Sequence, residues 1–183
     1  MTNRERFEKE VLVHMPAAYN LAWLLLRSRA EAEDVVQDTF LRAFRAFDQL
    51  QGAAKPWLLA IVRNVSYRRI QDRRRRGNVV SIDEVLGEEA SPHMSQLASQ
   101  DCTPEQSVLL SSELALLERA MQALPPVFRE VLSLREVEGL SYREIADVIG
   151  APVGTVMSRL SRAREDVRAA MLRLSEEDDA NAM

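Results

Sequence analysis

The spacing of apolar side chains constrains the fold of this 183-residue chain more than any other feature. Apolar residues recur three and four positions apart along most of the sequence, and no stretch shows sustained alternation of apolar and polar residues. The first pattern places apolar side chains on one face of a helix, whereas a half-buried strand requires the second. The sequence therefore predicts an all-α fold.

Three amphipathic helices are predicted within residues 1–76, where one N-terminal bundle is expected. The first helix follows Pro16. The third begins at Pro56, because proline fits the first turn of a helix. Ser28 and Glu31 have the spacing of a capping box and mark the start of the second helix. The core face of that second helix is expected to contain Val36, Phe40, Ala43, Phe44 and Phe47.

Helical periodicity is lost over residues 77–104, where Gly, Ser, Pro and acidic residues accumulate. Such a segment has little apolar surface to bury and is typical of a flexible linker. Periodicity resumes at Leu110, so a second small helical domain is expected over residues 105–174. An acidic tail, residues 175–183, is expected to follow it.

Charge is distributed unevenly along the chain, whose net charge is −4. Residues 63–76 contain seven arginines and one acid, whereas residues 79–105 contain six acids and neither Lys nor Arg. A polyanion responds to the local charge that it meets rather than to the total. The arginine-rich segment is therefore a candidate nucleic-acid surface despite the acidic total.

Composition argues against membrane, secreted and metal-binding proteins. No apolar run approaches the roughly 18 residues of a membrane span, and the charged N-terminus lacks the apolar core of a secretory signal. A cytoplasmic protein without membrane insertion is expected. Cys102 is the sole cysteine, and with His14 and His93 it is too isolated to form a zinc site, so neither metal nor cofactor is predicted.

A helix-turn-helix is the most specific pattern in the sequence. Ser141 and Glu144 repeat the capping-box spacing and begin a short helix, which Gly150 ends. Ala146, Gly150 and Val156 have the spacing of a helix-turn-helix. In this motif a small residue allows close approach, glycine permits the left-handed turn and an apolar residue holds the second helix on the first.

The second helix of this motif has two unlike faces. Val156, Leu160, Ala163 and Val167 form an apolar stripe, and Thr155, Ser158, Arg159 and Arg162 lie on the opposite side. Arginine binds guanine edges in the major groove, and hydroxyls bind bases or phosphates. The pattern predicts DNA readout, although a solvated face on a protein-interaction module is compatible with the same residues.

Residues 124–146 (LPPVFREVLSLREVEGLSYREIA) and 154–164 closely resemble region 4 of the extracytoplasmic-function (ECF) sigma factors. Residues 32–44 (AEDVVQDTFLRAF) are similar to region 2.2 of that family, and residues 57–64 (WLLAIVRN) with the following arginines are similar to regions 2.3 and 2.4. The resemblance implies a non-enzymatic subunit that lends promoter recognition to RNA polymerase. It also implies control by an anti-sigma factor.

The resemblance implies three binding surfaces on this chain. Binding to the β′ clamp helices of core polymerase is assigned to Asp34, Gln37, Asp38 and Leu41, and the β flap is expected as a further polymerase contact. Binding to the melted minus 10 element of promoter DNA is assigned to Trp57, Arg63, Asn64, Arg68, Arg69 and Arg73. Binding to the minus 35 element is assigned to Tyr142, Thr155, Ser158, Arg159, Ser161 and Arg162.

The N-terminal assignments can be checked against the residues themselves. The four core-binding residues lie on the face of their helix away from the expected core, and such a polar stripe by itself is more typical of a solvated face. Trp57 and Asn64 are seven residues apart and share one side of the third helix, where unpaired bases require an aromatic and a polar group. A core position is the alternative for Trp57, and a charge run favoured by the helix dipole is the alternative for residues 74–76.

Two departures from the family pattern concern promoter choice. The loop over residues 49–55 lacks the polar and aromatic residues often seen before the tryptophan, and Met157 stands where a basic residue is common. Neither departure affects a packing residue, so a change in the promoter recognised is expected rather than a loss of activity. The acidic linker is expected to pass through a basic channel of the polymerase.

Two other functions compete with this interpretation. A helix-turn-helix regulator that acts without core polymerase would carry a sensor or dimerisation domain in place of the sigma-like N-terminal segments. A metal nuclease would use Glu31, Asp34 and Asp38, but the sequence shows no second set of ligands, and acids in the first turns of a helix are favoured by its dipole.

Overall fold

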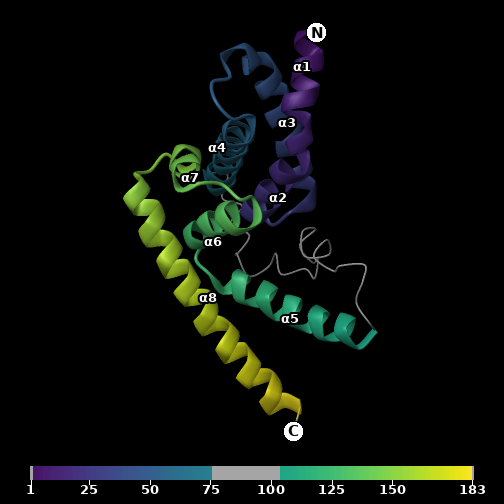
Figure 1. The fold of residues 1–183 in the computed structure, drawn as a ribbon, viewed down its shortest axis with the longest axis vertical. Helices are drawn as coiled ribbons and strands as arrows, with labels where there is room; N and C mark the ends of the chain where they lie inside the picture. The colour runs from purple at the N-terminus through teal and green to yellow at the C-terminus, as the bar shows by residue number, and fades with distance from the viewer. Residues whose placement is uncertain (1, 76–103, 183) are drawn as a thin grey trace. The chain divides into compact units, whose positions relative to one another are not determined.

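The computed structural model describes residues 2–75 and 104–182, and these residues contain helices and connecting segments but no strand. The all-α prediction is confirmed. The N-terminal elements are α1 (Asn3–Glu10), η1 (Leu12–His14), α2 (Met15–Leu26), α3 (Arg29–Ala46), η2 (Phe47–Gln49) and α4 (Ala54–Arg75) (Figure 1). The C-terminal elements are α5 (Pro104–Ala123), α6 (Pro126–Leu132), the π-helical η5 (Ser133–Val137), α7 (Tyr142–Ile149) and α8 (Val153–Ala182).

The chain divides into two compact units. The first comprises residues 1–87 and 133–156, and the second comprises residues 88–132 and 157–183. Residues 77–103 of the predicted linker, including Cys102, lie outside the described residues. None of the described helices is both long and apolar enough to cross a membrane.

Helices α2, α3 and α4 pack against one another and enclose the main core of the first unit. Its fully buried side chains include Leu21 and Leu26 of α2, and Leu58, Leu59 and Val62 of α4. Burial of apolar surface stabilises a fold by about 25 cal/mol per Å². These side chains therefore hold the three predicted helices together.

The buried face of α3 differs from the predicted one. Its buried residues are Ala32, Val35, Thr39 and Ala43. Phe44 is 47% exposed, and Val36 and Phe40 are half-buried, so the prediction that these three face the core is wrong. Small and branched side chains on the inner face let α3 approach its neighbours, and the bulkier side chains are left on the flank of the helix.

The structure adds a short helix, α1, before the three that the sequence predicts. Thr2 and Glu5 form a capping box at its start, in which Thr2 Oγ1 accepts a hydrogen bond from Glu5 N at 3.2 Å. Phe7 is buried, and its ring packs edge-on against the rings of Phe44 and Phe47. The ring centres are 5.1 Å apart for Phe44 and 5.3 Å apart for Phe47. These contacts hold α1 against the C-terminal end of α3.

The local signals of the helix-turn-helix are confirmed. Ser141 Oγ accepts a hydrogen bond from Glu144 N (3.3 Å), and Glu144 Oε2 accepts one from Ser141 N (2.8 Å). Gly150 ends α7 with a φ of +64°, which is the left-handed conformation that glycine tolerates best. Helix α8 continues as far as Ala182, through the segment expected to be an acidic tail.

Arginine side chains organise the second unit. Arg129 donates hydrogen bonds to three carbonyl oxygens at the C-terminal end of α5, at 2.7 to 2.9 Å. The last carbonyls of a helix have no partner within the helix, so Arg129 caps α5. Arg119 of α5 pairs with Asp178 of α8, with Nη1 and Oδ2 separated by 2.7 Å. This ion pair links the two long helices of the unit.

Candidate functional site

The four residues predicted to bind polymerase form one surface on α3, which we call the α3 stripe (Asp34, Gln37, Asp38 and Leu41). Asp34 and Gln37 are exposed, Asp38 is half-exposed, and Leu41 is 55% exposed. Asp38 accepts a hydrogen bond from Arg42, which raises the pKa of the Arg42 guanidinium. The stripe therefore combines fixed charges with one accessible apolar side chain.

An apolar groove of about 730 Å³ lies beside the α3 stripe and was not predicted from the sequence. It is lined by Leu12, Met15, Pro16 and Tyr19 on one side and by Glu33, Val36, Gln37, Phe40 and Leu41 on the other. Gln37 and Leu41 belong to both the stripe and the groove. The side chains of Val36 and Phe40, which were expected in the core, instead supply much of its apolar wall.

Helix α4 presents the residues predicted to bind unpaired DNA. Asn64 and Arg68 are exposed. Trp57 lies on the same side of the helix as Asn64, about two turns before it, and is half-buried rather than part of the core. The Arg63 guanidinium lies over the Tyr67 ring, 4.5 Å from its centre. Tyr67 was not predicted as a site residue, although an aromatic three residues after Asn64 falls close to it on a helix. The helix thus offers aromatic, amide and guanidinium groups together.

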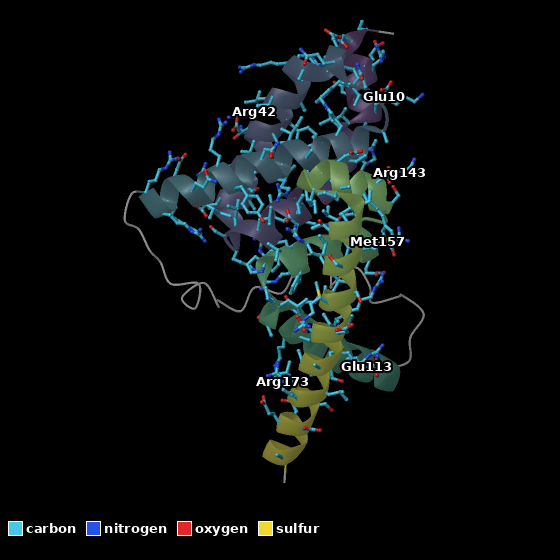
Figure 2. The ribbon with its side chains drawn as sticks, turned by 90° about the vertical axis from the view of Figure 1, so that its left-hand side faces the viewer. Glu10, Arg42, Glu113, Arg143, Met157 and Arg173 are labelled. Atoms are coloured by element: carbon cyan, nitrogen blue, oxygen red, sulfur yellow. The ribbon has the colours of Figure 1, made fainter. Side chains whose placement is uncertain are left out.

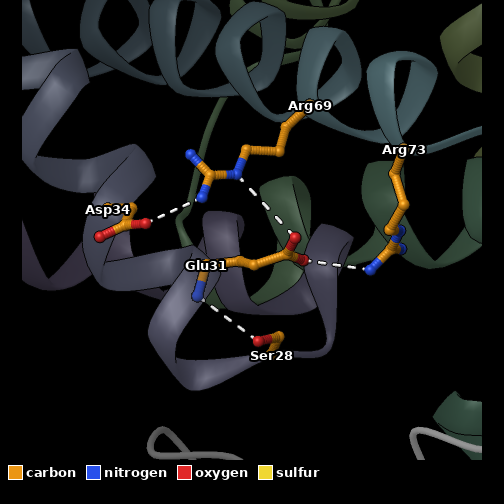
Figure 3. A network of polar contacts seen from close by, with 5 residues as sticks. All are labelled: Ser28, Glu31, Asp34, Arg69 and Arg73. Carbon is orange, nitrogen blue, oxygen red and sulfur yellow. Dashed lines mark hydrogen bonds and ion pairs between the residues drawn. The ribbon is translucent and has the colours of Figure 1, made fainter. Parts of the chain in front are cut away.

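The other two predicted DNA-binding arginines of α4 are paired with acids of α3 (Figure 3). Arg69 Nη2 donates to Asp34 Oδ2 at 2.8 Å, and Arg69 Nε lies 3.9 Å from Glu31 Oε1. Arg73 Nη1 donates to Glu31 Oε2 at 3.1 Å. We call these four residues the α3–α4 ion-pair network. It brings Asp34, from the predicted polymerase surface, into contact with Arg69, from the predicted DNA surface.

The ion-pair network also involves Glu31, which stands at the capping-box position of α3. Ser28 caps the helix as predicted, because its Oγ accepts a hydrogen bond from Glu31 N at 3.4 Å. The Glu31 carboxylate reaches across to Arg73 and Arg69 (Figure 3). The sequence cannot distinguish a glutamate that completes a capping box from one that pairs with a neighbouring helix, since both occupy the same position.

The N-terminal half of α8 carries most of the residues predicted to bind the minus 35 element. Ser158, Ser161 and Arg162 are exposed, and Thr155 and Arg159 are half-buried. Arg162 and Ser161 make only helix-local contacts in the described part of the chain, to Asp166 (3.5 Å) and Glu165 (3.4 Å) respectively. The opposite face is buried at Val156, Leu160 and Ala163, as predicted. The helix therefore has a polar face available to a groove of DNA.

Two other residues define the chemistry near the helix-turn-helix. Met157 is 54% exposed and projects from the first turns of α8 (Figure 2). It offers a flexible apolar side chain at a position where the family resemblance leads us to expect a basic residue. Tyr142 is half-buried at the start of α7, and the Arg135 guanidinium lies over its ring at 5.1 Å. Tyr142 is consequently held by Arg135.

The acids proposed for a metal nuclease do not converge. Glu31 and Asp34 pair with arginines of α4, and Asp38 pairs with Arg42. Within residues 2–75 and 104–182, no group of three His, Cys, Asp or Glu side chains is placed to hold a metal ion. The nuclease alternative therefore has no support from the geometry.

Comparisons with protein families match two separate parts of the chain. Residues 11–76 match the family described as Sigma-70 region 2, and residues 114–167 match the family described as Sigma-70, region 4. The first range contains the α3 stripe and all of α4. The second contains the helix-turn-helix.

Similar proteins cover almost the whole chain. The ECF RNA polymerase sigma factor SigE of Mycolicibacterium smegmatis is 34% identical over 96% of this chain, which spans 65% of that protein. The RNA polymerase sigma-H factor of Pseudomonas aeruginosa is also 34% identical, over 92% of this chain and 88% of its own length. Among solved structures, the chain is similar to the sigma factor RpoE of Bartonella quintana, which was determined in complex with the anti-sigma factor NepR. The match covers 90% of this chain and 96% of the RpoE chain, with 29% sequence identity and a TM-score of 0.68. With its exposed α3 stripe, its arginine-bearing α4 and its helix-turn-helix, this chain belongs to the extracytoplasmic-function subfamily of the sigma-70 family of RNA polymerase sigma factors.

Proposed function

We propose that this chain directs core RNA polymerase to specific promoters and is itself restrained by an anti-sigma factor. The observation that carries the proposal is the exposed Leu41 beside an apolar groove, on the same bundle as the amide and arginines of α4. A regulator that binds DNA alone needs no second docking surface next to its DNA-binding residues. A subunit that brings polymerase to DNA needs both.

Residues 1–76 are assigned to sigma region 2 and residues 105–174 to sigma region 4. The α3 stripe and the adjoining groove dock on the β′ clamp helices of the polymerase, with apolar side chains of the partner entering between α2 and α3. The half-apolar character of this surface supports the assignment, because helix partners are held by apolar anchors within a polar rim.

Helix α4 captures the melted minus 10 element in this proposal. Asn64 reads a base edge, Trp57 and Tyr67 support unstacked bases, and Arg63 and Arg68 contact the backbone. Each kind of group is one that single-stranded DNA requires. Helix α8 enters the major groove of the minus 35 element with the polar face that carries Ser158, Arg159 and Arg162.

Control by an anti-sigma factor is supported by the Bartonella quintana protein, which has a similar fold and was solved in complex with its anti-sigma factor NepR. An apolar groove and an exposed helix face are features that a competing helix can cover as well as polymerase can. We place the chain in the cytoplasm, where polymerase and DNA are found.

The experiment that tests the proposal is co-elution of the purified chain with core polymerase that has been stripped of its own sigma factors. A one-to-one complex on gel filtration supports the proposal. If the chain elutes alone while it shifts duplex promoter DNA without polymerase, the helix-turn-helix regulator becomes the better interpretation.

A further inference from the structure

The α3–α4 ion-pair network consists of two carboxylates on α3 and two guanidinium groups on α4 (Figure 3). Asp34 is the more exposed acid, with 60% of its side-chain surface accessible, and Glu31 is the more buried one, at 24%. Arg69 contacts both acids, at 2.8 Å and 3.9 Å, and Arg73 contacts Glu31 at 3.1 Å. Arg69 therefore joins the exposed and the buried parts of the network.

Each arginine in the network is partly neutralised by its acid. A guanidinium that donates to a carboxylate has fewer N–H groups left for a phosphate, and the nearby negative charge repels DNA. An ion pair exposed to water is weak and exchanges readily, so it does not prevent phosphate binding but competes with it. The competition is expected to reduce the DNA affinity of α4 by about twofold to fivefold.

Asp34 also belongs to the α3 stripe, so one carboxylate faces two possible partners. We propose that Asp34 holds Arg69 away from DNA in the free chain, and that contact of polymerase with Asp34 releases Arg69 to the promoter backbone. This inference rests on the proposed function, because it takes the α3 stripe as the polymerase-binding surface and α4 as the DNA-binding one. Reciprocity of binding then requires DNA to strengthen polymerase binding by the same factor.

Asp38 provides a matched control for Asp34. Both are acids of the α3 stripe, but Asp38 pairs with Arg42 four residues further along the same helix, at 3.0 Å. Asp34→Asn and Asp38→Asn each remove one negative charge from the same face. Only Asp34→Asn removes a charge that is paired with α4.

The first experiment measures the affinity of the free, full-length chain for a fluorescent single-stranded oligonucleotide of mixed sequence and about 20 nucleotides, by anisotropy over a range of salt concentrations. Asp34→Asn should bind about twofold to fivefold more tightly than the unmodified chain, with a salt dependence steeper by up to about 0.7 in log–log slope. Asp38→Asn should change little. If the two variants gain affinity equally, general charge removal explains the effect and the inference is wrong.

A double variant identifies the residue that is released. In an Arg69→Gln background, Asp34→Asn should give no further gain in oligonucleotide affinity, because the group that it frees is missing. A gain of the same size with and without Arg69 would overturn the assignment. Because the side chains of Asp34 and Arg69 are 60% and 43% accessible, thermal unfolding of each variant should match that of the unmodified chain, which verifies that folding is preserved.

The last experiment repeats the measurement with saturating core polymerase. The difference between the unmodified chain and Asp34→Asn should disappear, because polymerase already occupies Asp34. A difference that persists unchanged in the complex would contradict release by polymerase. If the unmodified chain binds no core polymerase, the proposed function fails by itself, and the oligonucleotide measurements still decide whether Asp34 masks Arg69.

Discussion

Individual side chains on this chain differ in whether they lie exposed on one helix or join two helices. Leu41 and Arg162 are exposed on helices whose opposite faces are buried, whereas Arg69 and Arg73 are held by acids of α3. Residue type alone predicts all four as contacts. The exposure of Leu41 and Arg162 indicates that substitution of either residue should affect binding without affecting folding.

Leu41→Ala should weaken binding to core polymerase by about fivefold to tenfold, because an apolar anchor at the edge of the groove is lost. Leu172, on α8, is the matched control, since its exposure of 61% is similar to the 55% of Leu41. Leu172→Ala should leave the affinity unchanged. Titration of labelled core polymerase measures both variants, and equal losses would remove the α3 stripe from the polymerase interface.

Arg162→Ala should lower transcription from cognate promoters about tenfold, the cost of losing one arginine contact to a base pair. Core binding should stay unchanged. Arg173 is also exposed on α8 but lies beyond the region 4 match (Figure 2), so Arg173→Ala should transcribe normally. If core binding falls together with transcription in Arg162→Ala, the substitution has damaged the domain and the minus 35 assignment loses its support.

At the scale of single elements, the sequence predicts features that depend on residues close together in the chain. Ser141, Glu144 and Gly150 behave as expected because capping and left-handed turns involve only neighbouring backbone. Periodicity also identifies residues that share a helix face, but it does not say which of two apolar faces turns inward. That is why Val36, Phe40 and Phe44 were assigned to the core, while the smaller residues around Val35 occupy it.

The groove and the ion-pair network could not be predicted from the sequence for a related reason. The groove requires Met15 and Phe40 to face each other across α2 and α3, and the network requires Arg69 to meet Asp34. These pairs are separated along the chain and depend on how the helices pack. The sequence predicted Asp34 and Arg69 as site residues but assigned them to different partners rather than to each other.

Gly150→Ala should reduce the free energy of unfolding by about 1 to 2 kcal/mol, because a side chain at φ +64° is strained although the space around it is open. Gly154 is the matched control. It lies in the first turn of α8 with no positive φ and nothing within 4 Å of an added Cβ, so Gly154→Ala should cost no stability. Urea denaturation compares the two, and an equal loss at both positions would show that the turn does not depend on a left-handed residue.

Glu144 should make the stability of α7 depend on pH. Its hydrogen bonds with Ser141 lower the pKa of the Glu144 carboxyl in the folded chain. A lowered folded-state pKa means that the charged form favours folding, so this contribution is present at neutral pH and is lost as the pH falls through that pKa. Glu144→Gln keeps a hydrogen-bond acceptor but does not ionise.

The difference in unfolding free energy between the unmodified chain and Glu144→Gln should therefore shrink as the pH falls from neutral through the lowered pKa of Glu144. Denaturant titrations at a series of pH values measure this difference. A difference that stays constant over the acid range would mean that the Glu144 charge contributes nothing to the cap.

At the scale of the whole molecule, one acidic chain carries helices that are locally basic. The net charge is −4, yet α4 ends in three arginines and α8 presents further arginines on its polar face. Acids of α3 offset part of the charge on α4. Such a chain is expected to bind DNA weakly by itself and to bind it well only when polymerase supplies further contacts and occupies Asp34.

The central claim is that this chain confers promoter recognition on RNA polymerase, and in vitro transcription tests it most directly. Core polymerase is incubated with a library of genomic fragments, with and without the purified chain, and the 5′ ends of the transcripts are sequenced. We predict a small set of discrete starts that appear only when the chain is present and share conserved elements upstream. Transcripts that are the same with and without the chain would contradict the account.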